Sequence, residues 1–114
     1  DIEKFAGIDV ETYSASPYLS FWNTVKYVLN FIKKDGVGTV GAKISTLQKI
    51  VYIIGENYTE FKIYNVPIDE MNGVLDEIES TLKTLNTITD KQKDSEAETE
   101  EDIKKVRTML DASK

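Results

Sequence analysis

The sequence has no cysteine and no histidine among its 114 residues. Without cysteine, disulfide bonds and thiolate metal sites are impossible, and the chain fits a reducing compartment such as the cytoplasm. Without histidine, it lacks the usual general base, the commonest metal ligand and the side chain that titrates nearest neutral pH. We therefore expect a protein that is not an enzyme and that needs neither a cofactor nor a metal.

Long apolar runs and clustered positive charge are also missing. The best apolar stretch, Val51–Ile54, is far shorter than the ~18 residues that cross a membrane. There are 20 acidic and 14 basic residues, which gives a net charge of −6. Nucleic acids and anionic membranes attract clustered lysine and arginine, whereas the lysines here alternate with acids. We expect neither of them as a partner, and therefore expect a protein partner.

The apolar residues that are present follow a helical spacing. They make up 40% of the chain, enough for one modest core. From Pro17, a typical first helical residue, they recur every three or four positions and predict a helix over 17–34. Thr39 is a plausible N-cap for a second helix over 40–54, which Gly55 would end.

The segment that follows, residues 56–66, is ambiguous. Phe61 and Ile63 alternate as in a strand, but a single helical turn fits as well, and we favour a short helix. Pro67 then opens a third helix over 67–88, because the apolar residues after it follow the a/d pattern of a bundle helix.

The two ends of the chain differ from the middle. Residues 8–13 alternate between two faces, which predicts a short strand. A lone strand leaves backbone groups unpaired, so this one would pair with another chain and make a homo-oligomer. Residues 90–102 hold one alanine and no larger apolar side chain, which predicts a solvated linker. A short helix over 101–112 would follow it.

Together these patterns predict a mainly α fold: a small helical bundle of three main helices, with a short N-terminal strand and a fourth short C-terminal helix. We expect a helical domain over 1–89. The remainder, 90–114, would be an acidic linker plus the short C-terminal helix, and would be partly disordered.

A glycine-rich turn offers one alternative function. Gly36–Gly41 matches G-x-G-x-x-G, the pattern of dinucleotide-binding turns. That fingerprint requires a preceding strand within a parallel sheet, whereas a helical apolar pattern precedes it here. We interpret the segment as a turn between helices and keep a nucleotide binder as a minor alternative.

Two groups of acidic residues could be mistaken for chemical sites. Asp90–Glu101 faintly resembles a calcium loop, but Gln92 and Ser95 stand where the loop needs an acid and a glycine. Three further carboxylates flank the apolar seam of the third helix and are expected to face water, where they are poor acids at neutral pH. These are Asp76, Glu77 and Glu79.

Six residues are candidates for contact with a partner. Three are aromatic side chains in the ambiguous segment, a residue type common among binding anchors. Three are apolar residues of the last helix, which could become ordered on binding. The six are Tyr58, Phe61, Tyr64, Ile103, Val106 and Leu110. The alternative for the aromatic residues is that they close one end of the bundle.

The order of three stretches resembles the tail assembly chaperones of long-tailed, siphovirus-type bacteriophages. The first is Thr12–Ser20, where a strand would run through a proline and an aromatic residue into the first helix. The second is the apolar helix that ends at Gly55. The third is Gly55–Val66, which has a glycine, an aromatic residue and a threonine followed by a Tyr-Asn pair.

This resemblance implies a function in virion assembly. Such chaperones coat the tape-measure protein, recruit tail-tube subunits and leave before the virion matures. It implies a non-enzymatic chaperone in the host cytoplasm, with tape-measure and tail-tube proteins as its partners. The second hypothesis is a small helical dimeric adaptor or regulatory subunit of a bacterial or viral complex.

Overall fold

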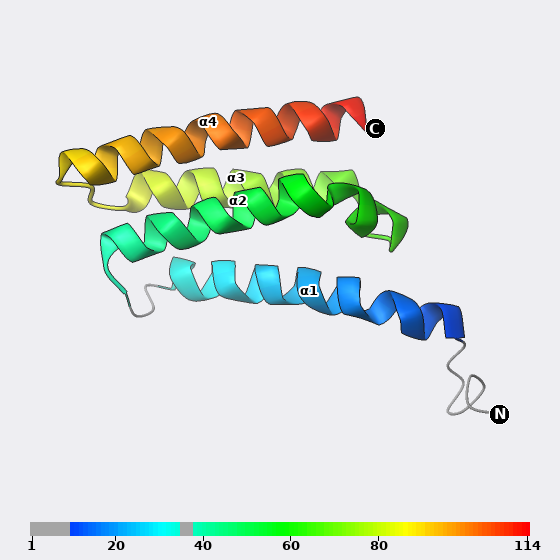
Figure 1. Ribbon diagram of the computed structural model, residues 1–114. Helices are drawn as coiled ribbons and strands as arrows, with labels where there is room; N and C mark the ends of the chain where they lie inside the picture. Colours follow the sequence, from blue (N-terminus) through cyan, green and yellow to red (C-terminus); the bar gives the residue numbers. More distant parts are fainter. Residues whose placement is uncertain (1–9, 35–37) are drawn as a thin grey trace.

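The structure is a computed structural model that describes residues 10–34 and 38–114, with side chains from residue 17 onward. Within these residues it contains four helices and no strand (Figure 1). The expectation of a mainly α-helical bundle is therefore confirmed. The helices are α1 (Val10–Lys33), α2 (Val40–Ile63), α3 (Ile68–Thr84) and α4 (Asp90–Ala112).

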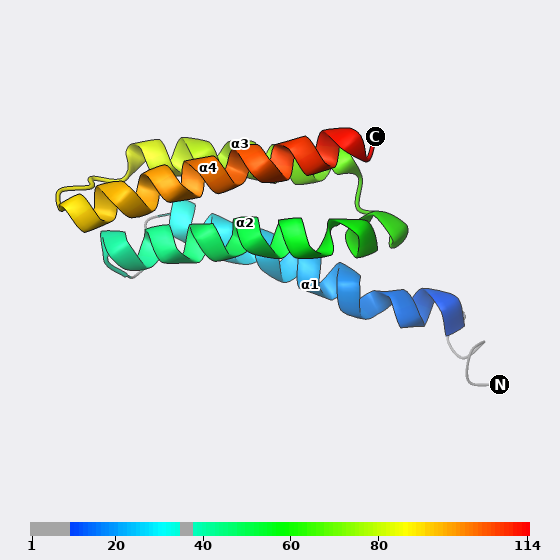
Figure 2. The same cartoon turned by 45° about the horizontal axis from the view of Figure 1, so that its top comes forward.

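Successive helices run in opposite directions, so that α2 and α4 are parallel to each other (Figure 1). α2 packs against each of the other three helices, whereas α1 and α4 share no packing contact among the described residues. Both views place α1 and α4 on opposite sides of the bundle (Figure 2). This arrangement separates the exposed surface of α1 from that of α4.

The predicted N-terminal strand is not present where the structure describes it. Residues 10–13 belong to α1, and the rest of the predicted strand, residues 8–9, lies outside the described residues. Pro17 lies inside α1 rather than at its first position. Proline removes one backbone N–H and therefore one helical hydrogen bond, which a long helix can tolerate. A six-residue alternation is also too short to distinguish a strand from part of a helix.

Gly55 does not end α2, which continues to Ile63. A β-carbon at Gly55 would lie 3.0 Å from Val106 Cγ2 and 3.6 Å from Met109 Cε of α4. The glycine therefore allows a close approach of two helices and is not a C-cap. The predicted short helix within 56–66 is the last part of α2.

The end of α2 is instead set by Asn65, whose φ of 73° is left-handed. The Val66 N–H donates to the Phe61 carbonyl at 2.8 Å, and the Asn65 N–H donates to the Lys62 carbonyl at 3.1 Å. These two bonds form a Schellman motif, which satisfies carbonyl groups that the helix end leaves free. At the other end, the predicted Thr39 cap is confirmed, because its hydroxyl accepts the Ala42 N–H at 3.1 Å.

The predicted solvated linker over 90–102 is wrong, because α4 is continuous from Asp90 to Ala112. A capping box starts it: the Thr89 hydroxyl accepts the Gln92 N–H, and the Gln92 side chain accepts the Thr89 N–H. Its glutamate, lysine and glutamine residues are good helix formers. Packing of the C-terminal half holds the helix in place, so the polar N-terminal half extends it without a core of its own.

The core runs the length of the bundle and takes side chains from all four helices. α3 supplies a regular a/d row, as predicted, although it ends at Thr84 rather than at residue 88. No helix of the described chain is long and apolar enough to span a membrane. The fully buried large side chains are Leu29, Ile44, Leu47, Val51, Ile54, Phe61, Met71, Leu75, Ile78, Leu82, Ile103 and Leu110.

Candidate partner-binding surfaces

Four of the six predicted partner residues lie in the core. Phe61, Ile103 and Leu110 are fully buried, and Val106 is 5% exposed. Phe61 packs against aromatic residues of α1, and Ile103 and Leu110 are enclosed where α4 packs on the bundle, whereas Val106 contributes its small exposed part to a groove between α2 and α4. Only Tyr58 and Tyr64 are half-buried and reach the surface.

The aromatic residues form one cluster that joins α1 to the end of α2. Phe61 is its centre, with ring centroids 5.2 Å from Trp22, 5.7 Å from Phe21 and 6.2 Å from Tyr18. Tyr18 also stacks on Tyr64 at 5.2 Å. Phe61 and Tyr64 therefore pack at one end of the bundle, as the alternative prediction has it, and Tyr58 packs half-buried against the core outside this cluster.

The lysines of α1 are directed toward α3. The Trp22 indole N–H donates to the Glu70 carboxylate, and Lys26 Nζ lies 3.2 Å from the same carboxylate oxygen. The indole hydrogen bond, followed by the Lys26 ammonium, holds the pKa of Glu70 below its usual value. About two turns further along, Lys33 pairs with Glu77.

The three carboxylates expected to face water are interhelical partners as well. Besides Glu77, Asp76 Oδ1 and Glu79 Oε1 lie 2.5 and 3.3 Å from Arg107 Nη2 of α4. They therefore tie α3 to its neighbours on both sides while staying near the solvent. Each has a cationic partner on a neighbouring helix.

With its lysines turned toward α3, α1 presents an uncharged row to the solvent. Its central members are Ser20, Thr24, Tyr27 and Phe31, spaced four, three and four residues apart, all exposed. Tyr27 is 70% and Phe31 is 45% exposed. These four residues are called the outer α1 strip below, because they lie on the side of α1 away from the core residues Val25 and Leu29.

A shallow groove of about 170 Å³ lies between α2 and α4. Val51, Gly55 and Val106 form its floor, because the missing side chain of Gly55 lets Val106 of α4 approach α2 closely. Tyr52, which is 67% exposed, and Met109, which is 37% exposed, lie on its two sides. The charged residues Glu56, Asp102 and Lys105 form its rim. We call this hollow the α2–α4 groove.

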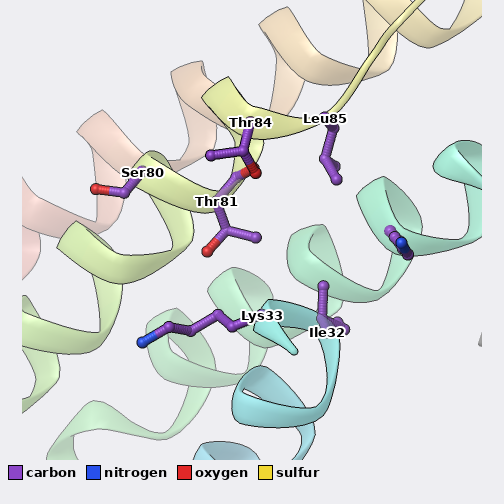
Figure 3. A pocket seen from close by; sticks show the side chains of 7 residues that line it. Ile32, Lys33, Ser80, Thr81, Thr84 and Leu85 are labelled. Carbon is purple, nitrogen blue, oxygen red and sulfur yellow. The ribbon is translucent and has the colours of Figure 1, made fainter. Parts of the chain in front are cut away.

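A larger hollow of about 470 Å³ opens where α1 and α3 end, beside the first turns of α2 (Figure 3). Three of its polar side chains are already engaged by the bundle. The Thr81 hydroxyl donates to the Glu77 carbonyl, the Thr84 hydroxyl donates to the Thr81 carbonyl, both at 2.7 Å, and Lys33 pairs with Glu77.

The glycine-rich turn and the acidic segment do not have the surroundings that their motifs require. A hollow of about 490 Å³ lined by Gly41 and Thr39 lies between the N-termini of α2 and α4, but the helix α1 precedes the turn, and the described residues form no sheet. Asp90–Glu101 is helical rather than a loop. Nowhere in the described chain do three or more acidic, histidine or cysteine residues gather to hold a metal ion.

Comparison with protein-family models, curated proteins and solved structures finds no match for this chain. The resemblance to tail assembly chaperones therefore rests on its three sequence stretches alone. Two of them adopt a different structure from the one expected, since the described part of Thr12–Ser20 is helical throughout and Gly55 lies inside α2. The assignment to that family stays a prediction.

Sequence reasoning missed the residues that make both surfaces. Tyr52 and Met109 are far apart in the chain, and only the packing of α2 on α4 brings them to one groove. Tyr27 and Phe31 did carry a signal, because they fall between the positions of the core row and repeat at helical spacing. A search for a second apolar row on the same helix would have found them.

Proposed function

We propose that this chain is a non-enzymatic assembly chaperone that holds an apolar helix of its partner in the α2–α4 groove. The observation that carries the proposal is the apolar floor formed where Gly55 lets α2 and α4 approach closely, between two exposed and adaptable side chains, Tyr52 and Met109. Tyrosine supplies a large contact area with a polar end, and methionine repacks easily around different partners.

The size of the groove favours a protein partner over a small molecule. Pockets for small ligands usually enclose about 300–1,000 Å³, whereas this one encloses about 170 Å³. Such a volume suits one apolar side chain projecting from a helix, with neighbouring residues of that helix resting on Tyr52 and Met109. The charged rim of Glu56, Asp102 and Lys105 gives the partner helix polar contacts at its edges.

The resemblance supplies the identity of the partner. A phage tape-measure protein carries long apolar helix faces, which aggregate unless they are covered until the tail tube encloses them. A chain of net charge −6 that covers them keeps the complex soluble. Weak contacts repeated along one filament gain strength by multivalency and are still displaced when tail-tube subunits arrive. This function belongs to the host cytoplasm.

Co-expression with a short tape-measure fragment that carries a single apolar helix tests the proposal. The wild-type chain should raise the soluble yield of the fragment several-fold. Tyr52→Glu should abolish the gain, because it places a carboxylate beside the apolar floor. Tyr27→Glu is the matched control: it changes an equally exposed tyrosine on another helix and should keep the gain. No gain with the wild-type chain contradicts the proposal.

The outer α1 strip favours the second candidate function, a small dimeric adaptor. An adaptor needs a self-association surface that is separate from its binding groove. The strip and the groove lie on different helices, and α1 does not touch α4 within the described residues. Both functions are therefore compatible with one chain.

A further inference from the structure

The outer α1 strip is an exposed apolar surface with no partner in the described chain. Tyr27 and Phe31 would each be expected in a core or an interface, yet they are 70% and 45% exposed. From Thr12 to Lys34 the sequence contains no acidic residue, although the chain has 20. A surface that is both aromatic and uncharged on an acidic protein is typical of an interaction site.

We propose that this strip binds the same strip of a second copy, with the two α1 helices antiparallel about a two-fold axis. The proposal goes beyond the proposed function and does not depend on it, because the partner groove lies between α2 and α4. The evidence is the order of small and large residues along the strip, together with the distribution of charge around it.

The strip is complementary to itself only in the antiparallel direction. Its N-terminal half is small, with Ser20 and Thr24, and its C-terminal half is large, with Tyr27 and Phe31. A two-fold axis midway between Thr24 and Tyr27 places Thr24 against Tyr27 of the second copy, and Ser20 against Phe31 of the second copy. Each aromatic ring thus meets a small residue, as an isologous interface requires. A parallel pair would set ring against ring and leave a gap at the small residues.

Burial in such an interface leaves no donor of Thr24 unpaired. Its hydroxyl already donates to the Ser20 carbonyl within α1, at 3.0 Å. Lys26 and Lys33 are bound to carboxylates of α3, so they are not directed at the second copy. The four residues of the contact are themselves uncharged, and Lys34, which follows Phe31 on the same side of the helix, is exposed at the outer end of the strip, so no unpaired charge lies at the centre of the contact.

Charge also favours the face of α1 over that of α4. α4 carries eight acidic and five basic residues, and it lies on the side of the bundle away from α1 (Figures 1 and 2). Association through α1 keeps the two α4 helices far apart, whereas association through α4 would bring them together. Two copies, each of net charge −6, thus repel less when their α1 helices meet than when their α4 helices meet.

The expected dimer is weak. A buried aromatic side chain contributes roughly 150–250 Å², so the exposed parts of Tyr27 and Phe31 supply only a few hundred Å² per copy. A standard interface buries about 800 Å² per partner. Polar neighbours such as Asn23 and Asn30 must supply the rest, so the mass should change with concentration in the micromolar to millimolar range.

Sedimentation equilibrium across that range tests the dimer. The mass of the wild-type chain should rise from monomer toward dimer, and Tyr27→Glu should stay monomeric. Ser20→Trp should also stay monomeric, because the indole fills the space that Phe31 of the second copy needs. Tyr52→Glu adds the same charge on another face and should dimerise like the wild type. Far-UV circular dichroism checks that each variant is folded.

Because the chain has no cysteine, cross-linking can test the direction of pairing. An oxidised mixture of Ser20→Cys and Phe31→Cys chains should form many more cross-links than either variant alone. In an antiparallel pair the two changed positions face each other, whereas identical positions are about 16 Å apart along the axis.

Four results would overturn the proposal. The first is a wild-type chain that stays monomeric throughout the range. The second is a Tyr27→Glu chain that dimerises as well as the wild type. The third is cross-linking that is equally strong within each single variant. The fourth is a Tyr27→Glu chain that has the same mass as the wild type but fails to solubilise the tape-measure fragment, which would make the strip the site of another protein.

Discussion

At the scale of single residues, two glycines inside helices have opposite roles. Gly73 lies in α3, and a β-carbon built there meets nothing within 4 Å. Gly55 lies in α2, where a β-carbon would meet Val106 at 3.0 Å. The sequence shows the same residue type in both places, and only the neighbouring helix distinguishes them.

Gly73→Ala should therefore stabilise the protein by about 0.5–1 kcal/mol, because alanine loses less backbone entropy on entering a helix. Gly55→Ala has the same gain in helix propensity but must displace Val106, so its net effect should be smaller or destabilising. Urea denaturation of the two variants measures both free energies of unfolding. Equal gains at the two sites would contradict the close approach of α2 and α4.

A second feature at the scale of single residues is that Glu70 makes the stability of the fold depend on pH. Its pKa is lowered first by the Trp22 hydrogen bond and then by Lys26. Because the pKa is lower in the folded state, the carboxylate stabilises the fold at pH values above the pKa of the unfolded state, near 4.5. This stabilisation is lost as the pH falls through the pKa of the folded state. The group is 40% exposed, so the effect should be below about 1 kcal/mol.

Glu70→Gln should accordingly lower the free energy of unfolding at pH 7, and the loss should be smaller at pH 3, where more of the wild-type carboxyl is protonated. Urea denaturation at the two pH values provides the comparison. Glu77→Gln serves as the control, because it removes an exposed ion pair without a buried indole beside it. A loss of equal size at both pH values would show that Glu70 acts by packing rather than by charge.

At the scale of elements, α4 depends on how it begins. Its first two turns contribute no buried apolar residue, so the capping box at Thr89 has to support them. Removal of an N-cap typically costs about 1 kcal/mol. Thr89→Ala should therefore destabilise the protein by about that amount and reduce its helical signal in far-UV circular dichroism. Thr108→Ala, the same change at an exposed position within α4, should have little effect or slightly stabilise the protein. Equal results for the two threonines would leave the box without a function.

The elements also show which parts of the fold could be predicted from the sequence. The helical row that leads to Leu29, the Thr39 cap and the a/d row of α3 are local patterns, and each was predictable. The first half of α4 was not, because composition suggested a linker while the cap and the packing of Ile103 decided the outcome. The α2–α4 groove was unpredictable for a stronger reason: its floor exists only because Gly55 meets a helix about 50 residues further on.

At the scale of the whole molecule, α4 decides whether the chain is one folding unit or two. The sequence suggested a domain over 1–89 with an appendage. In the structure, α4 covers the side of α2 and α3 opposite α1, and Ile103, Val106 and Leu110 are buried there. Gln48 of α2 and Arg107 of α4 add hydrogen bonds across the same interfaces.

A fragment of residues 1–89 should therefore fail to fold stably. Burying one aliphatic side chain contributes about 1.5–3 kcal/mol, so loss of these three removes on the order of 5–9 kcal/mol. Small domains have only about 5–15 kcal/mol in total. The fragment should lose cooperative thermal unfolding in circular dichroism and bind a hydrophobic dye, because Val51 and Ile54 lose their cover. Adding a synthetic 89–114 peptide should restore the cooperative transition in proportion to its concentration, whereas the same peptide with Ile103→Asp should not. A fragment that unfolds cooperatively at the temperature of the full chain would mean that α4 is an appendage after all, and that the α2–α4 groove is not a fixed part of the bundle.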